Sequence, residues 1–196
     1  RLVSSAASDV YKRQIIFRNK AKFNDDIYVT GNLGDSYMGL KILKKNFSLK
    51  KSLNRYFIKK YYLPELYINL SKKLFNFANT SLDISDGLFA DLDKLINKQK
   101  LSFEIDINKI PISNNLKNYL NKHKKKRSNY LFNGDDYQIL FTASKKKRLL
   151  IKSIARKMNQ KITKIGNINN GNKKNLLKLD NIPQNLTKFK GYSHKF

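Results

Sequence analysis

Residues 83–93 read DISDGLFADLD, which is Asp83-Ile84-Ser85-Asp86-Gly87-Leu88-Phe89-Ala90-Asp91-Leu92-Asp93. The residues from Ser81 to Ile84 predict a strand, and Gly87 allows the backbone to turn tightly after it. Apolar residues at helical spacing then predict a helix from Gly87 to Asn97: Leu88, Leu92, Leu95 and Ile96. A strand that passes through a tight turn into a helix is the repeating unit of layered α/β domains.

The chain on both sides continues this alternation of strands and helices. Short β-prone runs predict further strands at residues 27–30, 102–107, 137–142, 161–168 and 176–179. Apolar residues at helical spacing predict helices at residues 64–77, 115–122 and 145–158. The predicted fold class is therefore α/β, with a layered mixed sheet and flanking helices.

Single residues predict where two of the helices begin. Pro64 suits the first turn of a helix, because its missing N–H would be unpaired there in any case. Asp35 or Ser36 suits the N-cap of a short helix, because each side chain can accept a hydrogen bond from a free backbone amide. Residues 44–60 are basic and give no clear pattern.

The composition of the 196 residues bounds the protein class. Hydrophobic residues make up 40% of the chain, which is enough for a folded core. Cysteine is absent, which excludes disulfides, thiolate metal sites and a cysteine nucleophile and fits a cytoplasmic protein. No apolar run approaches the roughly 18 residues that span a bilayer, so we expect no membrane partner.

The formal net charge of +27 raises nucleic-acid binding as an alternative function. The lysines are spread along the whole chain together with abundant Asn and Ile, whose codons are also A/T-rich. We therefore favour a solvated basic surface, with no specific nucleic-acid partner. The one dense cluster, KHKKKR at Lys122–Arg127, predicts an exposed loop.

The first residues differ in composition from the rest of the chain. Ser4–Gln14 reads SSAASDVYKRQ, which is the translation of a DNA string that resembles a transposase adapter used in sequencing libraries. We expect residues 1–14 to be an artefact and exclude them from fold reasoning. Residues 15–31 are then the remnant of a missing N-terminal domain that leads into the first strand, and residues 32–196 are a C-terminal α/β domain.

The acidic stretch suggests a metal–phosphate site. Asp83 lies near the end of the predicted strand and Asp86 at the start of the helix, and ligands bind at this end of strands in open α/β sheets. The amides of Ser85, Asp86 and Gly87 are expected to point toward the same opening, which suits phosphate. Two carboxylates repel phosphate unless a divalent cation lies between them, and Mg²⁺ takes one or two carboxylates with phosphate oxygens and water.

Structural roles for these aspartates remain as alternatives. Asp86 could simply cap the helix, a contact worth about 1 kcal/mol. Asp91 and Asp93 fall off the apolar face of the helix and are expected to be solvated.

A second acidic segment and the C-terminal tail also invite two interpretations. Asn133–Gln138 reads NGDDYQ, which is either a turn entering a strand or a loop that presents a carboxylate to a cationic ligand. The tail Lys190–Phe196, KGYSHKF, is aromatic and suits packing as well as ligand contact. His194 alone indicates neither a metal nor a base.

The order of these motifs resembles the thiamine-monophosphate kinase family. That family has I-Y-V-T-G and G-D-S-x-x-G-L, then D-x-S-D-G-L with an Asp-Leu pair, then G-E-D-Y-E with L-x-F-T, then G-Y-x-H-F. Matching segments occur in the same order over residues 15–196: 27–31, 34–40, 83–88, 91–92, 134–138, 140–142 and 191–196.

The resemblance implies that ATP donates its γ-phosphate in line to thiamine monophosphate, giving thiamine diphosphate and ADP with Mg²⁺ and no covalent enzyme intermediate. Carried over by position, Asp83 and Asp86 are Mg²⁺ ligands. By the same resemblance Arg18 and Ser85 contact ATP. Substrate contacts fall on two further positions, Asp135 and Tyr192, and a carboxylate with a flat aromatic ring suits a cationic thiazolium.

The chain also departs from the family pattern. Asp135 replaces a Glu, Gln138 replaces a second Glu, and Lys195 is inserted in the tail. The family's N-terminal half, which carries most ATP and Mg²⁺ aspartates and builds the homodimer, has no counterpart here, so we expect this chain to be inactive alone. Other enzymes of the same ATP-binding superfamily, such as aminoimidazole ribonucleotide synthetase, selenophosphate synthetase or a hydrogenase-maturation protein, remain as alternatives.

Overall fold

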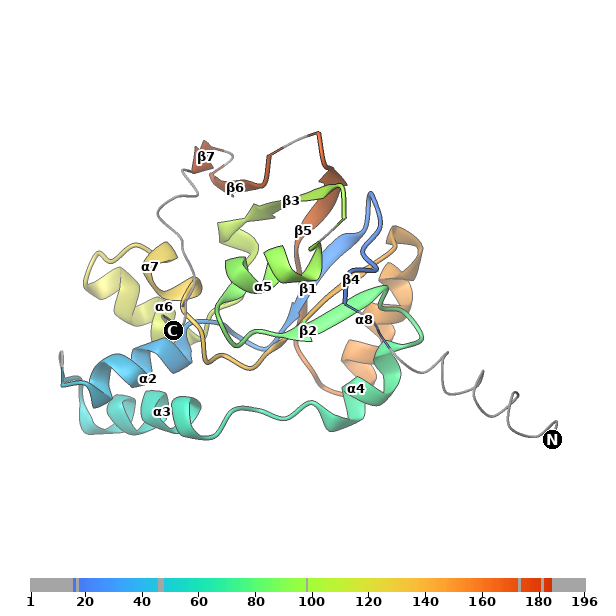
Figure 1. Ribbon diagram of the computed structural model, residues 1–196. Coiled ribbons are helices and arrows are strands. Elements are labelled where there is room, and N and C mark those ends of the chain that lie inside the picture. Colours follow the sequence, from blue (N-terminus) through green and yellow to red (C-terminus); the bar gives the residue numbers. More distant parts are fainter. Residues whose placement is uncertain are drawn as a thin grey trace, which may run out of the picture.

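The computed structural model describes residues 16, 18–45, 48–97, 99–172, 174–180 and 182–184. The adapter-like segment 1–14 and the tail with Tyr192 lie outside the described residues. Figure 1 shows a central sheet with helices over its faces and a separate group of helices at one end.

A seven-stranded mixed sheet forms the centre of the molecule, in the spatial order β2-β4-β1-β5-β3-β6-β7. All neighbouring strands are antiparallel except β3 and β6, which are parallel. This confirms the predicted mixed sheet. The strands are β1 (Asp26–Thr30), β2 (Thr80–Asp83), β3 (Leu101–Asp106), β4 (Ile139–Ala143), β5 (Ile162–Asn170), β6 (Leu176–Leu179) and β7 (Ile182–Gln184).

The predicted helices are present with shifted ends, and they are joined by two helices that the sequence did not predict, at residues 51–62 and 128–131. The α-helices are α2 (Asp35–Leu43), α3 (Lys51–Tyr62), α4 (Ile68–Leu74), α5 (Leu88–Leu95), α6 (Asn114–Lys122), α7 (Ser128–Leu131) and α8 (Arg148–Lys157). Two 3₁₀ turns are η1 (Ile107–Lys109) and η2 (Lys145–Lys147). Among the described residues, none of these helices combines the length and the apolar character needed to cross a lipid bilayer.

Alternating side chains of the central strands supply a core to each face of the sheet. On β1, Ile27 and Val29 join the core on the α5 side, whereas Tyr28 joins the core that contains side chains of α4 and α8. All five residues of β1 are buried, because this strand lies inside the sheet and is covered on both faces. The part of the range 15–31 that forms β1 is therefore integral to the sheet.

A third apolar cluster joins the helices at one end of the molecule. Met38 of α2, Phe57 of α3 and Leu116 of α6 are its fully buried members, and Tyr130 of α7 packs with them. Figure 1 shows these four helices gathered at one end of the sheet. The segment 44–60, which gave no clear pattern, contains most of α3 and contributes to this cluster through Phe57.

The prediction that Pro64 opens a helix is wrong. Residues 63–67 are not helical, and α4 begins only at Ile68. Tyr67 explains the difference, because its ring is buried and its hydroxyl donates a 2.7 Å hydrogen bond to Gln138 Oε1. This contact holds the segment against the sheet before the helix can start.

One edge of the sheet collects the loops that matter for function. β1 and β2 end there, and β4 begins there, since Val29 and Leu82 both pair with Leu140. β5 begins and β3 ends at the same edge, because β5 pairs antiparallel with β1, Thr30 opposite Ile162, and β3 pairs antiparallel with β5. The loops after β1, β2 and β3 and before β4 and β5 therefore lie along one edge.

Candidate functional site

The loop after β2 and the loop before β4 lie side by side. The Asp135 amide donates to the Ser85 carbonyl at 2.9 Å, and the Tyr137 amide donates to the Ile84 carbonyl at 2.8 Å. The Ile84 amide donates in turn to the Gln138 carbonyl at 2.9 Å. These bonds continue the pairing of β2 with β4 beyond the strands, so the two acidic segments of the sequence form one structural unit.

Two glycines allow this close approach. A Cβ added to Gly134 would lie 2.1 Å from the Ser85 carbonyl oxygen, so no side chain fits there. Gly87 has φ 112°, which favours glycine, and a Cβ there would lie 2.4 Å from the Phe132 carbonyl oxygen. The tight turn predicted at Gly87 is confirmed, and its reason is contact with the neighbouring loop.

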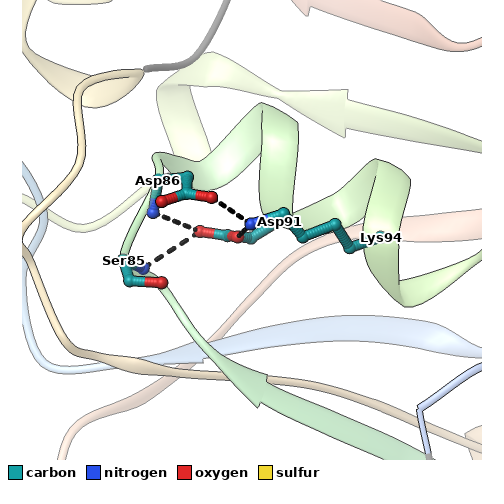
Figure 2. Close-up of polar contacts among 4 residues, drawn as sticks. All are labelled: Ser85, Asp86, Asp91 and Lys94. Carbon is teal, nitrogen blue, oxygen red and sulfur yellow. Dashed lines mark hydrogen bonds and ion pairs between the residues drawn. The ribbon is translucent and has the colours of Figure 1, made fainter. Parts of the chain in front are cut away.

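Asp91 is fully buried and supports the loop after β2 from beneath. Its Oδ2 accepts hydrogen bonds from the amides of Ser85 and Asp86, both at 3.0 Å, and its Oδ1 accepts from Lys94 Nζ at 2.9 Å (Figure 2). A carboxylate in the first turn of a helix is also favoured by the helix dipole. Asp91 thus fixes the shape of the turn that carries the candidate ligands.

Two expectations are wrong because of this contact. Asp91 is buried rather than solvated, since its carboxylate replaces water at two backbone donors. The amides of Ser85 and Asp86 are taken by Asp91 and are therefore not free to bind phosphate. Asp93 is exposed as expected, and its Oδ1 accepts a 2.9 Å hydrogen bond from Asn175.

Asp83 and Asp86 are the carboxylates that remain accessible in this loop. Asp83 is exposed at the end of β2. Asp86 is partly exposed and pairs with Lys94 Nζ, and it does not cap α5, whose N-cap is Gly87 without a side-chain hydrogen bond. The capping alternative for Asp86 is therefore not observed, and both carboxylates present oxygen atoms at the edge of the sheet.

Asp135 brings a third accessible carboxylate to the same place. Burial, and next the charge of Asp86, raise the pKa of Asp135 above its usual value. The pKa of the exposed Tyr137 is raised by burial and by the charges of Asp135, Asp83 and Asp86. The charges of Asp83, Asp86 and Asp135 thus all affect the pKa of Tyr137. The candidate metal ligands and the candidate substrate contact therefore lie in the same region of the molecule.

Asp135 and Tyr137 also have unusual backbone conformations. Their φ angles are 68° and 49°, in the left-handed region that few residues other than glycine adopt. Strain of this kind persists only where the surrounding contacts hold it, and it occurs often at functional sites. Here the contacts are the hydrogen bonds to the Ser85 and Ile84 carbonyls.

Asp136 has a role that the sequence analysis missed. Its two carboxylate oxygens accept from the Gly34 amide at 3.0 and 3.1 Å, so it caps the N-terminus of α2 from 102 residues away. Burial raises the pKa of Asp136 well above its usual value. No local pattern signals this contact, and the expected caps Asp35 and Ser36 fall inside the helix, which Gly34 precedes.

Asp35 is bound on the other side of the α2 N-terminus. Its carboxylate accepts from Ser113 Oγ at 2.7 Å and from Tyr56 Oη at 2.8 Å. Burial raises its pKa, and these two hydrogen bonds oppose the shift. Asp35 therefore joins α2 to α3 and α6 instead of capping its own helix.

Gln138 is buried at the end of the segment 133–138, where its carbonyl accepts from the Ile84 amide. Its Oε1 accepts from Tyr67 Oη at 2.7 Å and from Thr30 Oγ1 at 3.0 Å. Thr30 Oγ1 also accepts from the Ile139 amide at 2.8 Å. The side chain is thus an acceptor that ties the ends of β1 and β4 to the segment before α4, a role that needs no charge.

The structure does not bring Arg18 to this unit. Arg18 is exposed in the segment before β1, and nearby Ala21 accepts a hydrogen bond from Gln99, which follows the C-terminal end of α5. Ser85 lies before the opposite end of that helix. The prediction that Arg18 contacts ATP stays a prediction, as does the role of Tyr192 outside the described residues.

The donor atoms present suit a hard cation that brings other ligands with it. Within the described part of the chain, no group of three or more His, Cys, Asp or Glu side chains is placed to hold a metal ion. Asp83 and Asp86 supply two carboxylates, which is the number that Mg²⁺ uses when phosphate oxygens and water complete its shell. The unit can therefore take part in metal–phosphate binding but does not form a closed metal site by itself.

Comparisons with known proteins agree with this fold and these motifs. The profile of the family described as "AIR synthase related protein, C-terminal domain" matches residues 24–178. Thiamine-monophosphate kinase of Buchnera aphidicola subsp. Acyrthosiphon pisum (strain APS) is 38% identical over 192 residues. That match covers 93% of this chain and 57% of the relative, so the chain spans little more than half the length of this curated protein.

Solved structures give the same result. The structure of AaThiL complexed with AMPPCP and TMP aligns with a TM-score of 0.74 and 31% identity, covering 92% of this chain and 54% of that one. E. coli HypE, a hydrogenase maturation protein, aligns with a TM-score of 0.65 at 11% identity, covering 86% of this chain and 51% of that chain. The second likeness concerns the fold alone.

Proposed function

Because this chain belongs to the family of AIR synthase related proteins, C-terminal domain, we propose that it is the C-terminal part of a thiamine-monophosphate kinase. The whole enzyme transfers the γ-phosphate of ATP to thiamine monophosphate and releases thiamine diphosphate and ADP. One observation carries the proposal: the bond from the Asp135 amide to the Ser85 carbonyl joins the loop of the proposed metal ligands to the loop of the proposed substrate contact. A phosphate donor and its acceptor need such neighbouring loops.

Asp83 and Asp86 would hold Mg²⁺ in this enzyme. Their accessible carboxylates are hard oxygen donors, and Asp86 must exchange its ion pair with Lys94 for the metal. When bound, Mg²⁺ neutralises phosphate charge and orients the transferred group. Asp91 holds the loop in shape during this exchange, because its Oδ2 accepts from the backbone amides of Ser85 and Asp86, and only its Oδ1 shares Lys94 with Asp86.

The ATP contacts in this proposal are Ser85 and Arg18. Ser85 lies between the two candidate metal ligands, and its amide is occupied by Asp91, so its hydroxyl is the group left for a phosphate oxygen. Arg18 would act as a cation toward the triphosphate, as guanidinium groups commonly do.

Asp135 and Tyr192 would bind thiamine monophosphate. The thiazolium ring of the substrate is a cation, so a neighbouring carboxylate attracts it and an aromatic face can stack on it. The raised pKa of Asp135 means that the site favours an incoming positive charge, which would hold this carboxylate in its ionised form. Asp135 is shorter than the family's Glu, so the substrate must approach more closely.

The rest of the enzyme is also part of the proposal. The matched region is 57% of the Buchnera relative, and we propose that the rest of the enzyme supplies further metal ligands and the homodimer contact. We therefore propose a cytoplasmic homodimer for the whole enzyme and no turnover for this chain alone.

A chimera provides the decisive test. Residues 16–196 would replace the matching part of the Buchnera kinase, and ADP release would be followed with ATP, Mg²⁺ and thiamine monophosphate. We expect release that needs both Mg²⁺ and thiamine monophosphate in the chimera and none from the present chain. A chimera that unfolds cooperatively at the temperature of its parent but releases no thiamine-monophosphate-dependent ADP would contradict the proposal.

A further inference from the structure

A cavity lies at the same edge of the sheet, beside the segment that follows β3 and the start of β5. It has a volume of about 450 Å³ and is bordered by η1, the segment after it, α6 and the start of β5. Such a volume lies within the range of small-molecule sites, roughly 300–1,000 Å³. Its basic lining residues are Lys109, Lys117, Arg127 and Lys161, and no Asp or Glu is among the described residues that line it.

Arg127 is the most enclosed of these cations. Its guanidinium donates to the Asn108 carbonyl at 3.3 Å and to the Ile110 carbonyl, so it braces the segment that follows β3. Its Nε is buried and has no partner among the residues that the structure describes. Arg127 is the last residue of the basic cluster KHKKKR, for which the proposed kinase function gives no role.

Few negative charges compensate these cations. Asp106 pairs with Lys109 at 3.2 Å and interacts with Arg127 only at longer range. Lys161 donates to the neutral Asn32 Oδ1 at 2.7 Å. Burial and the neighbouring charge of Arg127 lower the pKa of Lys161, and the charge of Asp35 opposes this shift only in part.

We propose that this cavity binds the phosphate group of a small molecule, as a phosphate ester or a diphosphate. Arg and Lys side chains recognise phosphate through charge-assisted hydrogen bonds, and the exposed ammonium groups of Lys117 and Lys161 are suitable donors beside the charge of Arg127. The concave shape favours a small anion over an extended nucleic acid, which needs a groove or a flat basic face.

This site is separate from the metal–phosphate loop. The cavity lies beside the end of β3 and the start of β5. Asp83 and Asp86 lie at the end of β2, and β5 and β3 are the third and fourth strands from β2 in the order β2-β4-β1-β5-β3. Its donors are cations that bind phosphate directly, so no Mg²⁺ is required. Binding here therefore does not depend on the proposed kinase function.

Isothermal titration calorimetry of the full 196-residue chain tests the proposal. The probes are inorganic phosphate, sodium pyrophosphate and AMP, each titrated in EDTA at about 0.15 M NaCl to limit screening differences. We expect one saturable site for at least one probe. Lys161→Met and Lys117→Met should each weaken it about tenfold, since each removes a charged donor.

A matched control comes from the same basic cluster. Lys125→Met removes the same charge from an exposed residue that does not line the cavity, and it should change the affinity less than about twofold. Arg127→Met should abolish binding, but it also loses the brace to Ile110, so the two lysine variants carry the argument.

Three outcomes would overturn the proposal. The first is that no probe gives saturable heat. The second is that Lys125→Met weakens binding as much as Lys161→Met, which would indicate general charge. The third is that Asp86→Asn abolishes binding in EDTA, which would assign the heat to the loop after β2.

Discussion

The loop after β2 and the loop before β4 use their aspartates in the same way. Each is associated with one buried carboxylate that accepts backbone hydrogen bonds, Asp91 of α5 beneath the first loop and Asp136 within the second. Each has an accessible carboxylate beside it, Asp86 and Asp135. The inward groups hold backbone segments in place, and the accessible groups are left for chemistry.

The two inward carboxylates differ in how their charge is compensated. Asp91 has Lys94 Nζ at 2.9 Å, whereas no Lys or Arg among the described residues pairs with Asp136. Burial without a facing cation raises the pKa of Asp136 well above its usual value. The difference teaches that backbone amides can be bound either by an ion-paired carboxylate or by one that favours its neutral form.

The largest expected effect separates the accessible carboxylates from the inward ones. In the kinase chimera, Asp86→Asn should lower kcat/KM for thiamine monophosphate by at least about a hundredfold, because Mg²⁺ stabilisation of the transferred group is worth several kcal/mol. Its free energy of unfolding should change by less than about 1 kcal/mol, since the pair with Lys94 is largely exposed. Full activity in Asp86→Asn would remove the distinction between accessible and inward groups.

The next effect concerns stability alone. Asp91→Ala should lower the free energy of unfolding of this chain by about 3 kcal/mol, because two backbone amides and Lys94 lose their buried acceptor. Urea unfolding followed by circular dichroism measures it.

Asp93→Ala on the same helix is the control. Asp93 is exposed and has one hydrogen bond to Asn175, so it should cost less than about 1 kcal/mol. Equal losses in the two variants would show that Asp91 is not the support of the loop.

A smaller effect appears in the pH dependence of stability. The pKa of Asp136 is raised in the folded protein, so at a given pH the folded state binds more protons than the unfolded state. The resulting stability is lost as pH rises above about 3.9, the pKa of Asp in the unfolded chain. The free energy of unfolding of the wild type, minus that of Asp136→Asn, should therefore fall between about pH 4 and pH 7.

Asp26→Asn should change the pH dependence of stability in the opposite direction. Burial raises the pKa of Asp26, but hydrogen bonds and charges from Arg148 and Lys164 outweigh it, and the net shift is downward. The stability that Asp26 adds is lost as pH falls below about 4, so the wild type minus Asp26→Asn difference should rise with pH there. Slopes of equal sign in the two variants would contradict the assignment of a raised pKa to Asp136.

The smallest effect concerns the basic surface around the two acidic loops. Duplex DNA should bind weakly, and the affinity should be lost by about 0.2 M salt, because spread lysines give only counterion release. Fluorescence anisotropy over a salt series measures it, and Asp83→Asn with Asp86→Asn should change the affinity little. Tight binding that survives the salt series would favour the nucleic-acid alternative.

Much of the fold could be predicted from the sequence because its signals are local. The turn at Gly87 and the helix after it follow from residue type and helical spacing within a dozen residues, and α5 spans Leu88–Leu95 as a result. The fully buried β1 was found from its β-prone residues. The exposed KHKKKR loop likewise follows from charge density, although its last residue, Arg127, is half-buried.

The errors in the candidate site have a common origin in contacts over long distances. The sequence did contain a sign that Asp91 has a structural role, since acidic residues are favoured in the first turn of a helix. Its position off the apolar face nevertheless predicted that the side chain is solvated. The sequence contained no such sign for Asp136, because its partner Gly34 is 102 residues away. Pro64 failed for a similar reason, since Tyr67 is held by Gln138.

The sequence by itself determined the alternation of strands and helices, the glycine turn and the order of motifs that identifies the family. These depend on backbone preferences and on side-chain periodicity, which act between near neighbours. Only the tertiary structure decided which aspartates face inward, that the Asp83–Gly87 and Asn133–Gln138 loops form one unit, and that Arg127 joins Lys161 at a cavity. Those outcomes depend on which buried donors and acceptors meet once the chain has packed, because most buried polar groups form a hydrogen bond with a partner that can lie far away in the sequence.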